Sequence, residues 1–209
     1  MTRKIFKPFG PTILKAKMSE ELIKNLNNYT DEKSNLDLKE KKLDAGNALA
    51  GNVSQEIYLD EKFMKESGFG TFLFSEVANW IYSTKKKKIN KFKISASWIV
   101  RQYQNEYNPI HMHTGHISGV GYTKVPTHYG KTKQEEKPNK NGHLQLVHGS
   151  KSFMSESVMD ILPEVGDFYF FPHYLMLLFI HFVKQKMKED QYLSMLFWMM
   201  KYIFQHINE

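Results

Sequence analysis

The chain has 209 residues, 41% of them hydrophobic and 24% charged, which is enough for one globular domain with a buried core. It has no cysteine, so disulfides and thiolate metal sites are excluded, and a metal would need histidine or carboxylate ligands. The formal net charge is +7, but Arg3 and Arg101 are the only arginines, and arginine makes the base contacts that specific DNA readers favour. We therefore interpret the run Lys85–Lys88 as a solvated loop and expect no specific nucleic-acid partner.

Residues 1–90 are predicted to form a mainly helical support region of the same domain. A strand is expected over residues 9–14 after a Gly-Pro turn, and Ser19 is expected to cap a helix that begins at Glu20. The polar stretch 30–42 either continues this helix or forms a loop. Residues 59–82 carry apolar positions at the spacing of amphipathic helices packed on a sheet. The charged start of the chain lacks the apolar segment of a secretory signal, so we expect a cytoplasmic protein without a membrane partner.

From Lys91 the pattern changes to that of short strands. Residues 92–100 place alternate apolar side chains on one face, and further strands are expected at 119–125, 143–148 and 167–171. Turn residues separate them at a density that favours a sandwich or barrel. All nine histidines lie in this half, and His111 and His113 would project to the same face of a strand, where both can reach one cation. Such a pair alone is more often a surface or core feature than a metal site.

Several motifs in this half share their order and spacing with one family; they are Tyr107-Asn108-x-x-His111-x-His113, Ser118-Gly119-Val120-x-Tyr122, Asn141-Gly142, His148-Gly149-Ser150 and Val165-Gly166-Asp167-Phe168. From about Phe9 to Met176 the chain resembles the 2-oxoglutarate/Fe(II)-dependent oxygenases, prolyl-hydroxylase-like, of T4-like tailed bacteriophages. The resemblance implies an α+β fold with a mainly β core, a double-stranded β-helix (jelly roll) with N-terminal helices. It also implies Fe(II) and 2-oxoglutarate as cofactors, hydroxylation of a peptide or small molecule, and the host cytoplasm as location.

Carried over residue by residue, the resemblance makes His111 the first metal ligand and His113 the second, where the wider superfamily usually has Asp or Glu. Tyr122 is a candidate hydrogen-bond donor to 2-oxoglutarate, although a core tyrosine is as good an interpretation. Asp167 is interpreted as a turn residue rather than a ligand. The family also has a distal histidine ligand and an arginine that pairs with the 2-oxoglutarate carboxylate. Here Leu177 follows Met176, and no arginine follows Arg101.

A one-base deletion would explain both departures. With one A added to a suitable codon for Leu177, synonymous codons for the tail can be read as Met-His-Thr-Val-Tyr-Pro-Phe-Arg-Lys and then Arg-Arg-Ser-Ile-Ser-Phe-Asn, which restores the family motifs. On this hypothesis residues 91–176 form the barrel with the metal motif, and residues 177–209 are a divergent, frameshifted tail, so that the closing strands are lost. His116, His173 and His181 remain candidates for a replacement ligand.

Two alternatives stay open at this stage. The tail can instead be an ordinary amphipathic helix that packs on the barrel or joins two copies of the chain in a homo-oligomer. The function is then either that of a 2-oxoglutarate/Fe(II) hydroxylase with impaired activity, or that of a non-catalytic, degenerate jelly-roll phage protein with a binding or structural role. The sequence does not name the hydroxylated substrate.

Overall fold

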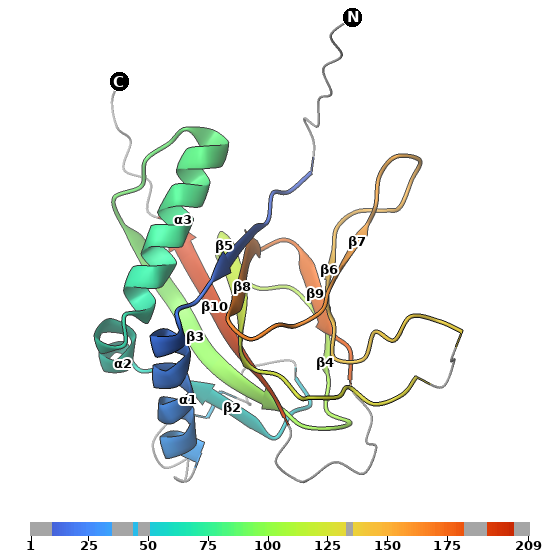
Figure 1. The fold of residues 1–209 in the computed structure, drawn as a ribbon. Helices are drawn as coiled ribbons and strands as arrows, with labels where there is room; N and C mark the ends of the chain where they lie inside the picture. The colour runs from blue at the N-terminus through green and yellow to red at the C-terminus, as the bar shows by residue number, and fades with distance from the viewer. Residues whose placement is uncertain (1–9, 35–43, 46–50, 133–135, 182–191, 203–209) are drawn as a thin grey trace, which may run out of the picture.

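The protein is described by a computed structural model over residues 10–34, 44–45, 51–132, 136–181 and 192–202. Two antiparallel sheets pack face to face, and helices cover the outer face of the larger one (Figure 1). The six-stranded sheet has the order β1 (Leu14–Lys17), β8 (Asp167–Pro172), β5 (Ile117–Lys124), β10 (Leu193–Tyr202), β3 (Phe92–Gln102) and β2 (Gln55–Tyr58). The four-stranded sheet has the order β4 (Asn108–His111), β9 (Met176–Phe179), β6 (Leu144–Val147) and β7 (Val158–Ile161).

Strands β3 to β10 follow the order of a jelly roll. Neighbours β3, β10, β5 and β8 form one layer, and β4, β9, β6 and β7 form the other. The strands expected around residues 92–100, 119–125, 143–148 and 167–171 are all present. The fold class expected from the sequence, a double-stranded β-helix with N-terminal helices, is therefore confirmed. The first strand starts later than expected, at Leu14.

In the described part of the chain, three helices stand on the outer face of the larger sheet, and their first turns explain where two of them begin. α1 (Glu20–Ser34) follows Ser19, whose hydroxyl accepts a hydrogen bond from the Leu22 amide at 3.2 Å. α2 (Glu61–Glu66) follows Asp60, whose carboxylate accepts from the Phe63 amide at 2.8 Å. α3 is Phe69–Lys85. No helix in the described part of the chain is long and apolar enough to span a bilayer.

The tail beyond Met176 contributes two strands, so the expected loss of the closing strands is wrong. β9 pairs with β4 and β6, and β10 lies between β3 and β5 in the larger sheet. The alternative of an amphipathic helix is wrong for Leu193–Tyr202 as well. Both faces of β10 are buried: Trp198 packs in the core under the helices, and Phe197 packs in the core between the sheets. A strand with two buried faces reads as a continuous apolar run, which explains why its sequence lacks alternation.

The predicted division of the chain at residues 90 and 176 stays a prediction.

Candidate functional site

The two candidate metal ligands lie together at one end of the barrel. His111 ends β4, and a register shift between Asn108 and His111 turns this residue toward Leu177 on β9. The ring centres of His111 and His113 are 5.2 Å apart. His113 is buried, with its ring edge-on to Trp98 at 5.7 Å and to Phe197 at 6.2 Å. The rings therefore lie together as expected, but not on one strand, because β4 ends at His111 and His113 follows it outside any strand.

The protonation of the pair suits ligation. Nδ1 of His111 lies 2.7 Å from the Pro109 carbonyl oxygen and so carries the proton, which leaves the Nε2 lone pair free. Both ring nitrogens of His113 are buried and have no hydrogen-bond partner in the described structure. Burial, with His111 as a lesser cause, lowers the pKa of His113 to about 3, and burial also lowers the pKa of His111. Both imidazoles are therefore neutral near pH 7, the form that binds a metal.

The geometry of these two rings fits a shared ion. A metal lies about 2 Å from an imidazole nitrogen, and hence about 3 Å from the ring centre. Two rings whose centres are 5.2 Å apart are thus within the span of one ion. A buried, unpartnered polar group also needs an explanation in a folded protein, and a metal ion would satisfy the His113 nitrogen.

The position directly opposite His111 holds a hydrocarbon side chain. Leu177 is the residue directly opposite His111 in the β4–β9 register, and it is fully buried in the core between the sheets. Residues directly opposite in an antiparallel pair have Cβ atoms about 4.5–5.5 Å apart, so a ligand at this position would face His111. Among the residues that the structure describes, no three His, Asp or Glu side chains gather as a metal site.

The other candidate histidines do not complete the set. His116 and His173 have ring centres 6.4 Å apart, and His173 Nδ1 lies 3.3 Å from the His116 carbonyl oxygen. His181 is exposed at the end of the described segment. Asp167 is buried in ion pairs with Lys15 and Lys17 at 2.7 and 2.6 Å, which agrees with its interpretation as a structural residue rather than a ligand.

Tyr122 carries a hydroxyl that suits a bound polar molecule. Its side chain is fully buried in the core between the sheets, and the hydroxyl has no hydrogen-bond partner in the described structure. Burial, with smaller contributions from Tyr169, Tyr129 and Asp167, raises the pKa of Tyr122 well above its usual value. The hydroxyl therefore keeps its proton and can donate it to an acceptor inside the barrel.

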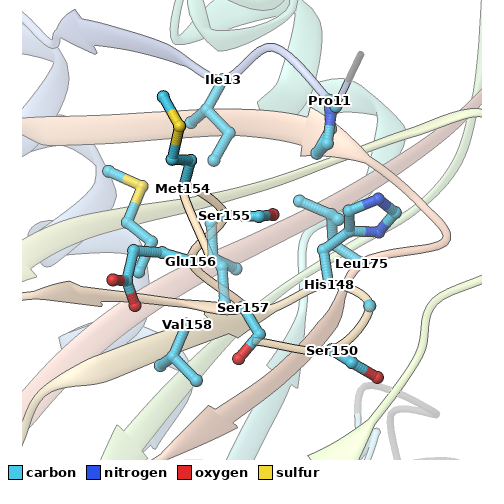
Figure 2. Close-up of a pocket in the computed structure, with 14 residues that line it drawn as sticks. Pro11, Ile13, His148, Ser150, Met154, Ser155, Glu156, Ser157, Val158 and Leu175 are labelled. Carbon is cyan, nitrogen blue, oxygen red and sulfur yellow. The ribbon is translucent and has the colours of Figure 1, made fainter. Parts of the chain in front are cut away.

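A cavity of about 570 Å³ opens at the same end of the barrel (Figure 2). Leu146 and Leu175 form part of its wall, and the hairpin between β6 and β7 forms its rim, with His148, Ser155 and Ser157. Leu146 is directly opposite Leu177, which in turn is opposite His111. The cavity thus lies two strands away from the histidine pair, and its volume is that of a small-molecule site.

Comparison with known proteins points to one family. Residues 96–197 match the family model described as "Putative 2OG-Fe(II) oxygenase", a range that contains both histidines and the first half of β10. This supports a 2OG-Fe(II) oxygenase. The cofactors expected from the sequence, Fe(II) and 2-oxoglutarate, are those of this oxygenase family. No match was found among curated proteins.

Solved structures of such oxygenases share the fold. A prolyl-4-hydroxylase from Pseudomonas putida has a TM-score of 0.57 and 11% identity, with 91% of this chain and 92% of that chain covered. The viral collagen prolyl hydroxylase from Paramecium bursaria Chlorella virus-1, solved as a 2-oxoglutarate complex, has a TM-score of 0.53 and 14% identity. The match covers 91% of this chain and 96% of that chain. HygX from Streptomyces hygroscopicus, with nickel and 2-oxoglutarate bound, has a TM-score of 0.52 and 8% identity. The match covers 88% of this chain and 80% of that chain. At these identities the likeness shows the fold.

One buried group of this oxygenase-like barrel was not found from the sequence. Glu56 is 3% exposed, and neither carboxylate oxygen has a partner in the described structure. It is opposite Val100 in the β2–β3 register and so faces the core between the sheets. Burial, followed by the charges of Asp44 and Glu106, raises the pKa of Glu56 to about 7. No sequence signal marks it, because its burial depends on how β2 aligns with β3.

Proposed function

We propose that this chain is a 2-oxoglutarate- and Fe(II)-dependent hydroxylase in which His111 and His113 hold the metal. The observation that carries the proposal is the buried, unpartnered His113 ring, 5.2 Å from a His111 ring whose Nε2 is free. When bound, Fe(II) with 2-oxoglutarate and oxygen supplies the oxidation that hydroxylates an unactivated C–H bond.

The barrel's own residues would position the reactants and exclude water. Trp98 and Phe197 stack at 5.3 Å with their planes nearly parallel, and both rings contact His113 edge-on. They hold the imidazole in one orientation and keep that side of the site dry. We assign the Tyr122 hydroxyl to a hydrogen bond with 2-oxoglutarate, because it is a buried donor without an acceptor. The cavity at the β6–β7 hairpin is the place for a substrate, either a peptide or a small molecule.

In this particular chain we expect impaired activity. Leu177 cannot bind a metal, and a site with two of three protein ligands should hold iron more weakly. Arg101, the last arginine in the sequence, cannot replace the missing 2-oxoglutarate partner. Its guanidinium is held on the helix side by Asp31 and by Ser34, at 3.1 Å from the Ser34 hydroxyl.

A one-base deletion in a phage gene is our proposed origin of this defect. The restored reading frame puts histidine at position 177, and position 177 is the residue directly opposite His111. The codon change and the strand register thus point independently to the same position, and this agreement supports the proposal. Sequencing the gene across the codon of Leu177 tests it: if the alternative frame does not encode His-Thr-Val-Tyr-Pro-Phe-Arg, the deletion is refuted.

The activity test compares three proteins: the chain as it stands, the Leu177→His variant and a frame-restored chain. Each receives Fe(II), ascorbate, oxygen and 2-oxoglutarate, and succinate is measured. We expect the frame-restored chain to form succinate and the chain as it stands to form little. A frame-restored His111→Ala variant is the matched control and should be inactive. Equal, robust succinate formation by the three proteins would refute the proposed role of position 177 as a metal ligand. Absence of both metal binding and turnover in all would favour the alternative of a non-catalytic jelly-roll binding or structural protein.

A further inference from the structure

The buried carboxylate of Glu56 lies where the edges of the two sheets meet. Just before β2 and β4 begin, the chain is joined by a hydrogen bond from the Asn52 amide to the Tyr107 carbonyl oxygen, at 2.9 Å. Glu56 is inside this junction, and neither of its carboxylate oxygens has a partner in the described structure. A carboxylate that leaves water without a hydrogen bond or an ion pair is strongly disfavoured. The group therefore needs either a proton or a cation.

The side-chain oxygen of Asn108 faces the same place as the Glu56 carboxylate. A Cβ atom added to Gly51 would lie 3.0 Å from both Glu56 Oε1 and Asn108 Oδ1, so these two oxygens are no more than twice 3.0 Å apart. Asn108 is 5% exposed. The nitrogen of an ammonium group lies about 2.7–3.2 Å from each oxygen that accepts its hydrogen bonds. One such group can therefore reach both oxygens.

Gln102 brings a further oxygen toward this place. It follows Val100 on the same face of β3, and Val100 is the residue directly opposite Glu56. Diagonal neighbours on one face of a sheet are about 7–8 Å apart, which long side chains can bridge. The Gln102 side-chain nitrogen donates to the Glu106 carbonyl oxygen at 2.8 Å, and Gln102 Oε1 is left buried without a partner in the described structure. The three side chains thus present only oxygen atoms to this corner of the barrel.

The charge around Glu56 favours a cation. Among the described residues, the charged groups that act on Glu56 are Asp44 and Glu106, and both are acidic. The Glu106 carboxylate is already held by the Ser54 and Tyr103 amides, at 3.0 and 2.8 Å. No three His, Asp or Glu side chains of the described chain gather as a metal site, and a divalent ion usually takes more carboxylates than one. The single carboxylate of Glu56 matches a single positive charge.

We propose that Glu56, Asn108 and Gln102 form a binding site for a singly charged cation, either an alkali ion or the ammonium group of a small organic ligand. The carboxylate balances the charge, and the amide oxygens supply the remaining contacts. The site uses no imidazole and does not rest on the proposed hydroxylase function. Below about pH 7 a proton replaces the cation, because burial, followed by the charges of Asp44 and Glu106, raises the pKa of Glu56 to about 7.

The test measures Tm of the full chain at pH 8 and pH 6 in potassium, sodium or methylammonium chloride. The reference is tetramethylammonium chloride at the same ionic strength, because this ion is bulky and has no N–H group. At pH 8 at least one of the three cations should raise Tm by about 3–6 °C at about ten times its Kd. At pH 6 this shift should fall to about a third or less, because the folded protein then holds the proton. The cation that gives the larger shift distinguishes an alkali ion from an ammonium ligand.

Variants connect the shift to the three side chains. Glu56→Gln keeps the shape of the side chain without its charge and should abolish the cation-specific shift. Asn108→Ala should weaken cation binding about tenfold. Glu66→Gln, at an exposed acidic residue of α2, is the matched control and should keep the full shift. The comparison of the two pH values needs the wild type alone, so the proposal is tested even if Glu56→Gln does not fold.

Three results would overturn the proposal. The first is an equal Tm in all four salts at pH 8. The second is a cation-specific shift that Glu56→Gln keeps or that is as large at pH 6 as at pH 8, because the cation would then bind elsewhere. The third is a larger shift with calcium chloride at matched ionic strength, because the site would then hold a divalent ion.

Discussion

Replacing Leu177 by histidine should convert a two-histidine site into a three-ligand site, at a cost in stability that metal reverses. Leu177 is fully buried, so the variant loses hydrocarbon burial and gains a buried imidazole without a partner. We expect the metal-free variant to lose about 3 kcal/mol of unfolding free energy. For a chain of this length this lowers Tm by about 6–12 °C. A metal at about 100 times its Kd returns about 2.7 kcal/mol, which recovers most of the loss.

The assay is thermal unfolding with and without Fe(II) under anaerobic conditions, or with Ni(II) as a redox-stable substitute. The matched control is Leu146→His, at a position that is equally apolar and buried but lies one strand farther from His111. It should lose similar stability and gain no extra stabilisation from metal. If metal stabilises Leu177→His no more than it stabilises the wild type, or stabilises both histidine variants equally, the inferred geometry of the site is wrong.

Three further predictions test the metal pair, the buried acid and the tail. His113→Ala should abolish Ni(II) binding measured by calorimetry, while His148→Ala should leave it intact. Because the pKa of Glu56 is raised from 4.5 to about 7, the wild type should lose about 3 kcal/mol of stability as pH rises through this window, since only the unfolded state has released the proton. Glu56→Gln should remove this pH dependence in urea unfolding, and a retained slope would exclude Glu56 as its source. Phe197→Ala should destabilise the fold by about 3–5 kcal/mol, whereas Phe153→Ala, at a residue 94% exposed, should have no measurable effect; equal effects would contradict the burial of β10.

The parts of the fold that were predictable are those with local signals. The apolar alternation over residues 92–100 predicted β3, although a register shift at Ser95 puts Phe92 and Ile94 on the helix side and not on the face of Trp98. The spacing of His111 and His113 predicted that their rings lie close together. β10 could not be recognised in this way, because it is buried on both faces and pairs with β3 across about 100 positions of sequence. Its apolar run fits a helix or a strand equally well, and only the long-range pairing decides between them.

Two features of the site depended on register, which the sequence does not display. Leu177 was suspected from a missing motif, but its position opposite His111 follows from how β9 aligns with β4. Glu56 was missed altogether, because a one-residue slip of β2 against β3 would turn its carboxylate toward the helices. Register is set by the sum of many contacts, so a single residue's face cannot be read from its neighbours in the chain.

The same strands show why the fold and the site respond differently to a change of sequence. A barrel core accepts many apolar side chains of suitable volume, and Leu177 and Phe197 satisfy this requirement in β9 and β10. Metal ligation instead requires a particular donor atom at one position, and leucine has none. A tail with the right hydrophobicity can therefore close the barrel while leaving the metal site incomplete. Likeness in fold alone therefore does not measure activity, and we expect the residue opposite His111 to have the larger effect on it.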